Sequence, residues 1–207
     1  MELIIMANKI FISFRFNDGH DYRNRLCEKF DELDYTINKA EKVDRGDKSE
    51  STIQKYLYKQ LKDTSLTIVI LTPDALNYRK DYFGKIDDWM YDELRYSLED
   101  RSGNRSNGVI AIYTDETRNS LFSNGISTCN CGEIHKTIND FDNLARKNMF
   151  NVKSAYKYCK CGAYDPLQDH YISLVSFQEF YSNPKKYIDN ALEKRNRSSE
   201  FNLIKRI

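Results

Sequence analysis

Apolar runs of strand length alternate along this chain with segments of helical periodicity, and this alternation constrains the fold more than any other feature. The clearest run, SLTIVILT at residues 65–72, is apolar on both faces, as expected of a central strand in a parallel sheet. The other expected strands cover residues 9–14, 35–42, 107–114 and 170–177.

Amphipathic patterns of helical period separate these runs. The expected helices cover residues 20–33, 51–61 and 87–100, and a last helix starts at Asn183-Pro184, which are good N-cap and N1 residues. Repeated β-α-β order predicts an α/β fold in which helices cover both faces of a parallel sheet. Five such strands fit the flavodoxin-like order 2-1-3-4-5, and we expect residues 1–207 to form a single domain.

The connection between the fourth and fifth expected strands, residues 115–169, is unusually long and has little periodicity. It contains Cys-x-Cys-Gly twice, and its four cysteines are Cys129, Cys131, Cys159 and Cys161. Two cysteine pairs supply the tetrahedral thiolate set that zinc prefers, so we predict a structural zinc site in this insertion. His135 and His170 are reserve ligands. The alternative is a set of free thiols or a redox-sensitive pair.

Composition excludes several classes of partner. The 207 residues carry a formal net charge of +1, which gives no electrostatic reason to expect nucleic acid or a membrane as the main partner. MELIIM lacks the basic and long apolar regions of a signal peptide, and no apolar run is long enough to span a bilayer. An odd number of cysteines, five, does not fit a secreted disulfide framework, so we expect a cytoplasmic protein.

One acidic residue, Glu93, falls on the apolar face of the expected helix 87–100. At about 100° per residue it lies beside Trp89, within the arc that Ile86 and Met90 begin. The other charged residues of this segment are expected in solvent; they are Asp88, Asp92, Arg95 and Glu99.

The expected topology gives the inward position of Glu93 a meaning. Ligands of open α/β sheets bind beyond the carboxyl ends of the strands at the switch point, here between the first and third strands. The segment Arg15–Gly19 is expected to be the loop after strand one, and Glu93 is expected one to two turns below the same crevice. The alternative is a glutamate that forms a salt bridge or bends out to solvent.

Two motifs in this arrangement resemble those of TIR-like domains. IFISFRFND, residues 10–18, followed by Asp21-Tyr22-Arg23, resembles their first strand and loop. Trp89 and Glu93 form a W-x-x-x-E motif similar to that of NAD-cleaving TIR domains. The chain most resembles the bacterial TIR-like family of Thoeris antiphage defence, whose Ser-Phe-x-aromatic-x-Asp loop is matched by Ser13, Phe14, Phe16 and Asp18. The resemblance covers about residues 8–114 with the last strand and helix, and leaves out the cysteine-bearing insertion.

This resemblance implies cleavage of NAD at the nicotinamide–ribose bond, by an NAD glycohydrolase or an ADP-ribosyl cyclase or transferase. It places the catalytic carboxylate at Glu93 and a crevice wall at Trp89. It also implies stacking by Phe14 and Phe16, a phosphate contact from Arg15 and a substrate contact from Asp18. It further implies self-association, for which the polar loop 43–50 is the candidate, and an effector protein that reads the product.

Two other functions fit the same topology. A non-catalytic TIR-like scaffold would signal by self-association, and Glu93 would then be incidental. A response-regulator receiver needs an acidic cluster after strand one, a phosphoacceptor aspartate and a lysine after strand five. Asn17-Asp18 and Asp74 match this pattern only loosely, and Ser176-Phe177-Gln178 supplies no lysine.

Overall fold

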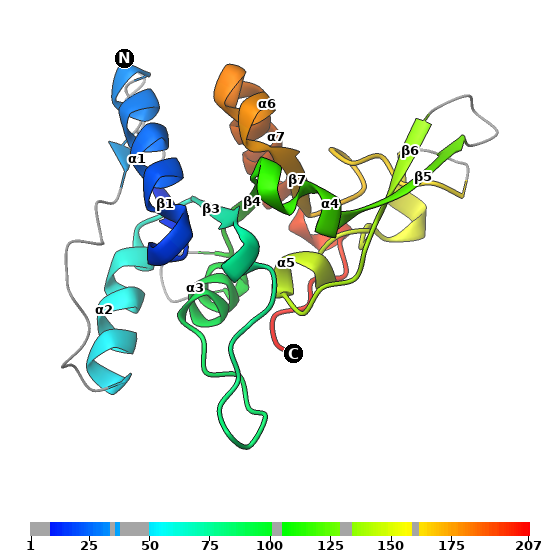
Figure 1. Cartoon of the computed structure of the whole chain (residues 1–207). Helices are drawn as coiled ribbons and strands as arrows, with labels where there is room; N and C mark the ends of the chain where they lie inside the picture. Colours follow the sequence, from blue (N-terminus) through cyan, green and yellow to red (C-terminus); the bar gives the residue numbers. More distant parts are fainter. Residues whose placement is uncertain (1–8, 34–35, 38–49, 101–104, 129–133, 159–161) are drawn as a thin grey trace, which may run out of the picture.

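The computed structural model (Figure 1) describes residues 9–33, 36–37, 50–100, 105–128, 134–158 and 162–207. Its main sheet has the order β2-β1-β3-β4-β7, and every neighbouring pair is parallel. The strands are β1 (Lys9–Ser13), β2 (Thr36–Ile37), β3 (Leu66–Leu71), β4 (Gly108–Tyr113) and β7 (Ile172–Ser176). The expected α/β class with a parallel sheet is therefore confirmed.

The two central strands explain the continuous apolar runs in the sequence. All residues of β3 and β4 are buried, because helices cover the sheet on both sides. A strand with no solvent-facing side has no reason to alternate polar and apolar residues.

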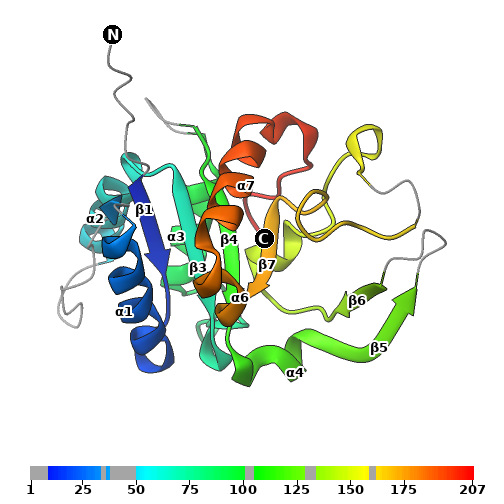
Figure 2. The same ribbon diagram turned by 90° about the horizontal axis from the view of Figure 1, so that it is seen from above.

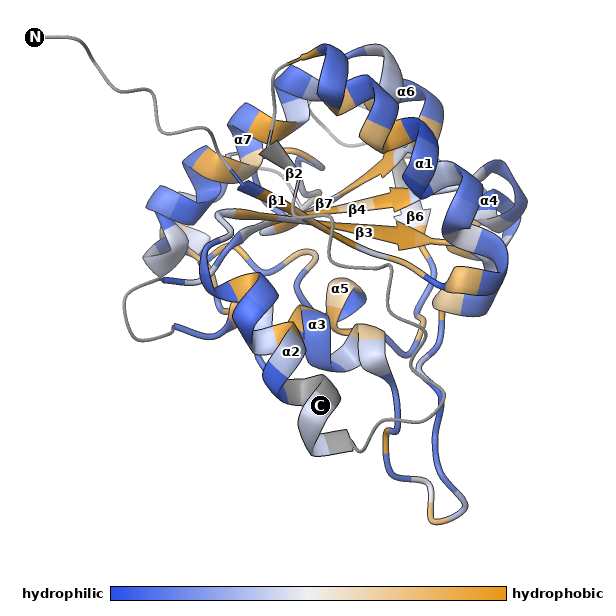
Figure 3. Cartoon of the chain, turned by 90° about the vertical axis from the view of Figure 1, so that its left-hand side faces the viewer, coloured by the Kyte–Doolittle hydropathy of each residue, from blue (hydrophilic) through white to orange (hydrophobic). Residues whose placement is uncertain are grey.

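Helices pack in two layers, one on each face of the sheet (Figure 3). The first layer contains α1 (Phe16–Glu32), α6 (Phe177–Ser182) and α7 (Pro184–Asn196), whose buried residues form one apolar core with the sheet. The second contains α2 (Glu50–Lys62), α3 (Trp89–Leu98) and α5 (Leu144–Lys147). Contact between α7 and β4 is so close that a Cβ on Gly108 would lie 2.5 Å from the carbonyl oxygen of Ala191. Glycine at this position lets the helix and the strand approach.

Residues 115–169 contain more regular structure than their sequence predicts. After the short turns η2 (Asp115–Thr117) and α4 (Arg118–Leu121), strands β5 (Phe122–Thr128) and β6 (Ile134–Ile138) form an antiparallel hairpin. This hairpin lies beyond the β7 side of the main sheet (Figure 2). Leu121, Ile138 and Leu144 nevertheless join the apolar core beneath the sheet, so the described part of this segment packs on the same body.

Two expected element boundaries are wrong, and one is confirmed. Helix α1 begins at Phe16, directly after Arg15, so residues 16–19 form its first turn and not a loop. Helix α3 spans Trp89–Leu98 and begins two residues later than the expected helix 87–100. The last helix starts as predicted, with Pro184 in its first turn and the Asn183 side chain accepting a hydrogen bond from the amide of Lys186. Short 3₁₀ turns complete the description: η1 (Pro73–Ala75), η3 (Ser154–Tyr156) and η4 (Ser198–Glu200).

Candidate functional site

Helix α3 starts beside the carboxyl ends of β1 and β3, where the connections leave the sheet in opposite directions. Its N-cap is Asp88, whose Oδ1 accepts a hydrogen bond of 2.9 Å from the amide of Met90. Aspartate is a favoured N-cap because its carboxylate satisfies an amide that has no partner within the helix. The expectation that Asp88 points into solvent is wrong: the residue is only 5% exposed.

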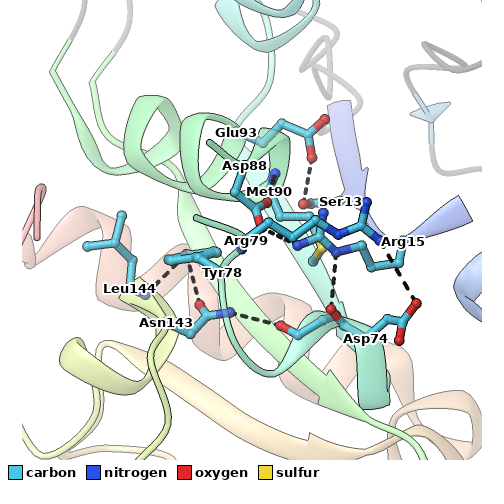
Figure 4. Close-up of polar contacts among 11 residues, drawn as sticks. Ser13, Arg15, Asp74, Tyr78, Arg79, Asp88, Met90, Glu93, Asn143 and Leu144 are labelled. Carbon is cyan, nitrogen blue, oxygen red and sulfur yellow. Dashed lines mark hydrogen bonds and ion pairs between the residues drawn. The ribbon is translucent and has the colours of Figure 1, made fainter. Parts of the chain in front are cut away.

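Glu93, one turn along α3, points inward as its position on the helical wheel indicates. The residue is 2% exposed, and its Oε2 accepts a 2.6 Å hydrogen bond from Oγ of Ser13 (Figure 4). Ser13 is the last residue of β1 and is fully buried. The surroundings are not wholly apolar, because Ser97 lies on the next turn and donates its hydroxyl to the carbonyl oxygen of Glu93 at 2.8 Å. The carboxylate is thus held by a polar side chain at the end of the central sheet.

Arg15 forms a second link between the end of β1 and the start of α3. Its guanidinium donates to Oδ2 of Asp88 in a buried ion pair, and its Nε donates to the carbonyl oxygen of Asp74 at 3.2 Å (Figure 4). Oδ2 of Asp88 also accepts from the amide of Arg79 at 2.7 Å. Arg15 is therefore already committed to protein acceptors in this conformation, and a phosphate group would have to compete with Asp88 for it.

Asp18 connects the first turn of α1 to the segment after β3. One carboxylate oxygen accepts from the hydroxyl of Thr72 at 2.7 Å, and the other accepts from the amide of Asp74 at 3.0 Å. Asp18 is half-buried, and it fixes the backbone that also receives the Nε–H of Arg15.

The three aromatic residues named from the sequence lie in three different surroundings. Phe14 is buried in the core beneath α1, where Gly19 packs against its ring. Trp89 is half-buried against the cluster under α2, on the other face of the sheet. Phe16 is 71% exposed, with its ring 5.2 Å from that of His20. Glu93 and Arg15 each contact a residue to which the sequence motif gave no role as a ligand or partner.

Those two residues are Ser13 and Asp88. Asp88 carried a readable signal, since an aspartate directly before the first helical residue is an N-cap candidate. The hydrogen bond from Ser13 had no such signal, because serine and glutamate are 80 residues apart in sequence.

The predicted zinc ligands Cys129, Cys131, Cys159 and Cys161 lie outside the described residues. Within the described part of the chain, no group of three or more histidine, cysteine, aspartate or glutamate side chains is positioned to hold a metal ion.

The reserve ligand His170 is 2% exposed and packs against Phe150 with the two rings tilted by 57° and 4.3 Å between their centroids. Neither ring nitrogen has a hydrogen-bond partner within the described residues. Burial lowers the pKa of His170 to about 3, and the nearby charges of Lys194 and Arg146 act in the same direction. His170 is therefore a neutral core residue at physiological pH.

The sequence matches no protein-family model, and a search of the curated proteins found no relative. None of the helices among the described residues is both long and apolar enough to cross a membrane.

Proposed function

We propose that this chain is a TIR-like enzyme that cleaves NAD at the nicotinamide–ribose bond, with Glu93 as its catalytic carboxylate. The observation that carries the proposal is the buried Glu93, held by Ser13 at the carboxyl end of β1. The strand order β2-β1-β3-β4-β7 supports a flavodoxin-like arrangement, in which ligands bind at the switch point between the first and third strands. The W-x-x-x-E motif and the Ser-Phe-Arg-Phe segment, which begins with the last residue of β1, support the TIR-like assignment.

The chemistry suits a carboxylate with little access to water. Loss of nicotinamide leaves positive charge on the anomeric carbon, as in other reactions with an oxocarbenium-like transition state. A carboxylate at low local dielectric stabilises such a charge more strongly than one in water. The Ser13 hydroxyl fixes the carboxylate before substrate arrives, which reduces the reorganisation needed during the reaction.

The other site residues take different roles in this proposal. Arg15 is a positioning residue that holds Asp88 and with it the first turn of α3, and Asp18 holds the neighbouring backbone. Phe16 is the exposed aromatic residue available for stacking, whereas Phe14 and Trp89 support the walls of the site. The ADP-ribose product leaves as a linear, cyclic or conjugated molecule, and an effector protein of a bacterial antiphage system reads it in the cytoplasm.

The test is NAD cleavage by wild type, Glu93→Gln and Asp92→Asn at matched concentration, followed by mass spectrometry of the products. Glu93→Gln keeps the shape of the side chain and removes its charge, so cleavage is expected to fall by on the order of 10²–10³. Asp92 is the control, because it is partly exposed and its carboxylate pairs with Arg95 at 3.1 Å. Melting temperatures of the three proteins show whether each is folded.

Two results would contradict the proposal. Equal rates for wild type and Glu93→Gln would remove Glu93 from the chemistry. A wild-type protein that leaves NAD intact, at high concentration and with infected-cell extract added, would favour the non-catalytic scaffold.

We also propose that Cys129, Cys131, Cys159 and Cys161 bind one structural zinc ion, and that loop 43–50 contributes to self-association. The zinc proposal rests on the two Cys-x-Cys-Gly sequences, since thiolates are preferred zinc ligands. Protein purified without a histidine tag should contain about one zinc per chain by elemental analysis. A content well below this value would show that the four cysteines do not form a zinc site. Residues 43–49 of this loop lie outside the described residues, and Glu50 is the first residue of α2. The proposed role of the loop rests on the resemblance alone.

A further inference from the structure

A loop formed by residues 79–87 projects from the body of the molecule between η1 and α3 (Figures 1 and 3). We call it the aromatic loop. Its two arms are held together by a bridge between Lys80 and Ile86 and by a hydrogen bond of 2.8 Å from the amide of Asp81 to the carbonyl oxygen of Lys85. The loop is therefore a small hairpin with its own hydrogen bonds.

The tip of the aromatic loop is built to hold one conformation. Oδ1 of Asp81 accepts hydrogen bonds of 2.9 Å from the amides of both Phe83 and Lys85. Gly84 has a φ of 78°, a value that glycine adopts without strain. A preformed turn binds a partner with less loss of conformational entropy than a flexible loop.

Two aromatic side chains occupy this tip and face solvent. Tyr82 is 96% exposed and Phe83 is 89% exposed, the highest values among the large hydrophobic residues that the structure describes. Their rings lie edge to face, with 5.4 Å between centroids. Aromatic residues of this size each bury about 150–250 Å² when covered, so leaving both in water forgoes a large hydrophobic gain.

A pocket of about 400 Å³ lies at the base of the same loop, on the side of α3. Its lining consists of Gly84, the apolar residues Ile86, Tyr91 and Ile207, and the charged residues Lys80, Lys85 and Asp142. Lys80 is paired with Asp142 at 2.6 Å, so Lys85 is the lysine to meet an aromatic ring. Aromatic rings fit such a site, because their edges pack on the apolar walls and their faces attract ammonium groups.

We propose that the aromatic loop and this pocket form a symmetric interface with a second copy of the chain. In this dimer the Tyr82–Phe83 tip of each copy enters the pocket of the other, and the two loops lie side by side in opposite directions. Tip and pocket belong to the same loop, so a reciprocal exchange uses the same surface of both copies, which is the condition for closed two-fold symmetry. It is independent of the NAD chemistry proposed above.

The expected area favours a reversible dimer. Two aromatic side chains from each copy supply roughly 600–1,000 Å², and the pocket walls that they cover add a similar amount. Complete coverage would give roughly 1,200–2,000 Å², the range of specific interfaces, and because side chains are seldom covered completely we expect a dissociation constant on the order of micromolar.

Charge argues against a membrane as the alternative occupant. Within residues 79–87, Arg79, Lys80 and Lys85 are balanced by Asp81 and Asp87, a net of +1 from three positive and two negative charges. Recognition of anionic lipid by electrostatics uses clusters of about four to eight basic residues. Asp81 lies directly beside the aromatic pair and would be carried to the lipid surface with it.

Sedimentation velocity over a range of concentrations tests the interface. Wild type should show a monomer–dimer equilibrium, and the double variant Tyr82→Ser/Phe83→Ser should weaken it at least about tenfold, since central aromatic residues dominate interface energies. The matched control is Tyr156→Ser/Tyr158→Ser, two tyrosines that are 52% and 71% exposed outside the loop. This control should leave the equilibrium unchanged.

A pocket variant tests whether the insertion is reciprocal. Ile86→Arg places charge in the pocket and should also abolish the homodimer, with a melting temperature to show that the protein is folded. Mixing it with the tip variant should restore a weak heterodimer, because the intact tip of one chain meets the intact pocket of the other. If Ile86→Arg does not fold, the tip variant and its control still decide the proposal.

Three results would overturn the proposal. Wild type could stay monomeric at the highest soluble concentration, or the tip variant could dimerise as strongly as wild type. In the third result, monomeric wild type would float with phosphatidylcholine–phosphatidylserine vesicles and the tip variant would not. That result would show that the loop binds a membrane.

Discussion

A buried lysine provides the sharpest test of how this fold responds to pH. Lys194 on α7 is fully buried, and its Nζ donates to the carbonyl oxygen of His170 at 2.7 Å and to Oγ of Ser173 at 2.6 Å. Both acceptors are neutral. A charged ammonium group in this position has lost its hydration, and neither of these two contacts is with a carboxylate that would compensate for the loss. Burial therefore disfavours the charged form of Lys194.

Burial lowers the pKa of Lys194 from 10.5 to about 7, and the charge of Arg197 adds to the effect. Asp165 and Glu193 act in the opposite direction. Between pH 7 and 10.5 the unfolded chain keeps a proton on this lysine that the folded protein has released. Stability therefore rises with pH through this window, and the full cost of the buried charge is present below pH 7.

Lys194→Met should remove this dependence, because methionine has a similar shape and no proton to release. One pKa unit corresponds to about 1.36 kcal/mol, so the stability of wild type relative to the variant should rise by roughly 2–3 kcal/mol between pH 7.5 and 9.5. Below pH 7, the difference between the pKa of 10.5 in the unfolded chain and about 7 in the fold means that the buried charge costs wild type about 5 kcal/mol of stability. The variant avoids this cost but loses two hydrogen bonds of about 1–3 kcal/mol each. The variant should thus be as stable as wild type or more stable at pH 6.5.

Urea unfolding of wild type and Lys194→Met at half-unit intervals from pH 6.5 to 9.5 measures the effect. Lys186→Met is the matched control, because this lysine is exposed on the same helix. The stability of Lys186→Met should follow that of wild type at every pH. Parallel curves for wild type and Lys194→Met would refute the argument, since they would show that Lys194 has the same protonation in both states.

Two further predictions concern other buried groups. Arg15→Met leaves the carboxylate of Asp88 buried without its cation and should destabilise the protein by about 3–5 kcal/mol in urea unfolding. Adding Asp88→Asn should cost less than the sum of the single changes, whereas additive costs would show that the pair is not coupled. His170, whose pKa is lowered to about 3, remains neutral in the fold while the unfolded chain binds a proton below pH 6.5. Stability should therefore fall by about 1.36 kcal/mol per pH unit as pH drops from 6.5 towards 3, and His170→Phe should show a flatter profile over pH 4–6.5. Profiles of equal slope would contradict the assignment of a neutral buried His170.

Local sequence determined the class of fold. The apolar runs that became β3 and β4 needed no tertiary information, because a strand covered on both faces must be apolar throughout. The start of α7 was equally readable, since Asn183 and Pro184 satisfy local requirements of a helix terminus. The inward direction of Glu93 followed from helical periodicity alone.

The start of α1 depended on contacts between residues that are far apart in the sequence, which no short stretch of sequence contains. Helix α1 begins at Phe16 without a side-chain cap, because the arginine at the N-cap position has no hydrogen-bond acceptor. The guanidinium of Arg15 instead pairs with Asp88, 73 residues away. The first turn of α1 is then tied to the segment after β3 through Asp18. Local propensity gave no sign of either link.

Only the tertiary structure decided what surrounds Glu93. The sequence placed a carboxylate on an inner helix face, and a buried carboxylate is unfavourable unless donors reach it. The sheet supplies one from Ser13, because β1 is paired with β3 and α3 packs against the face of both strands. Periodicity fixes which side of a helix a residue occupies, whereas the partner it meets there depends on strand pairing between distant segments.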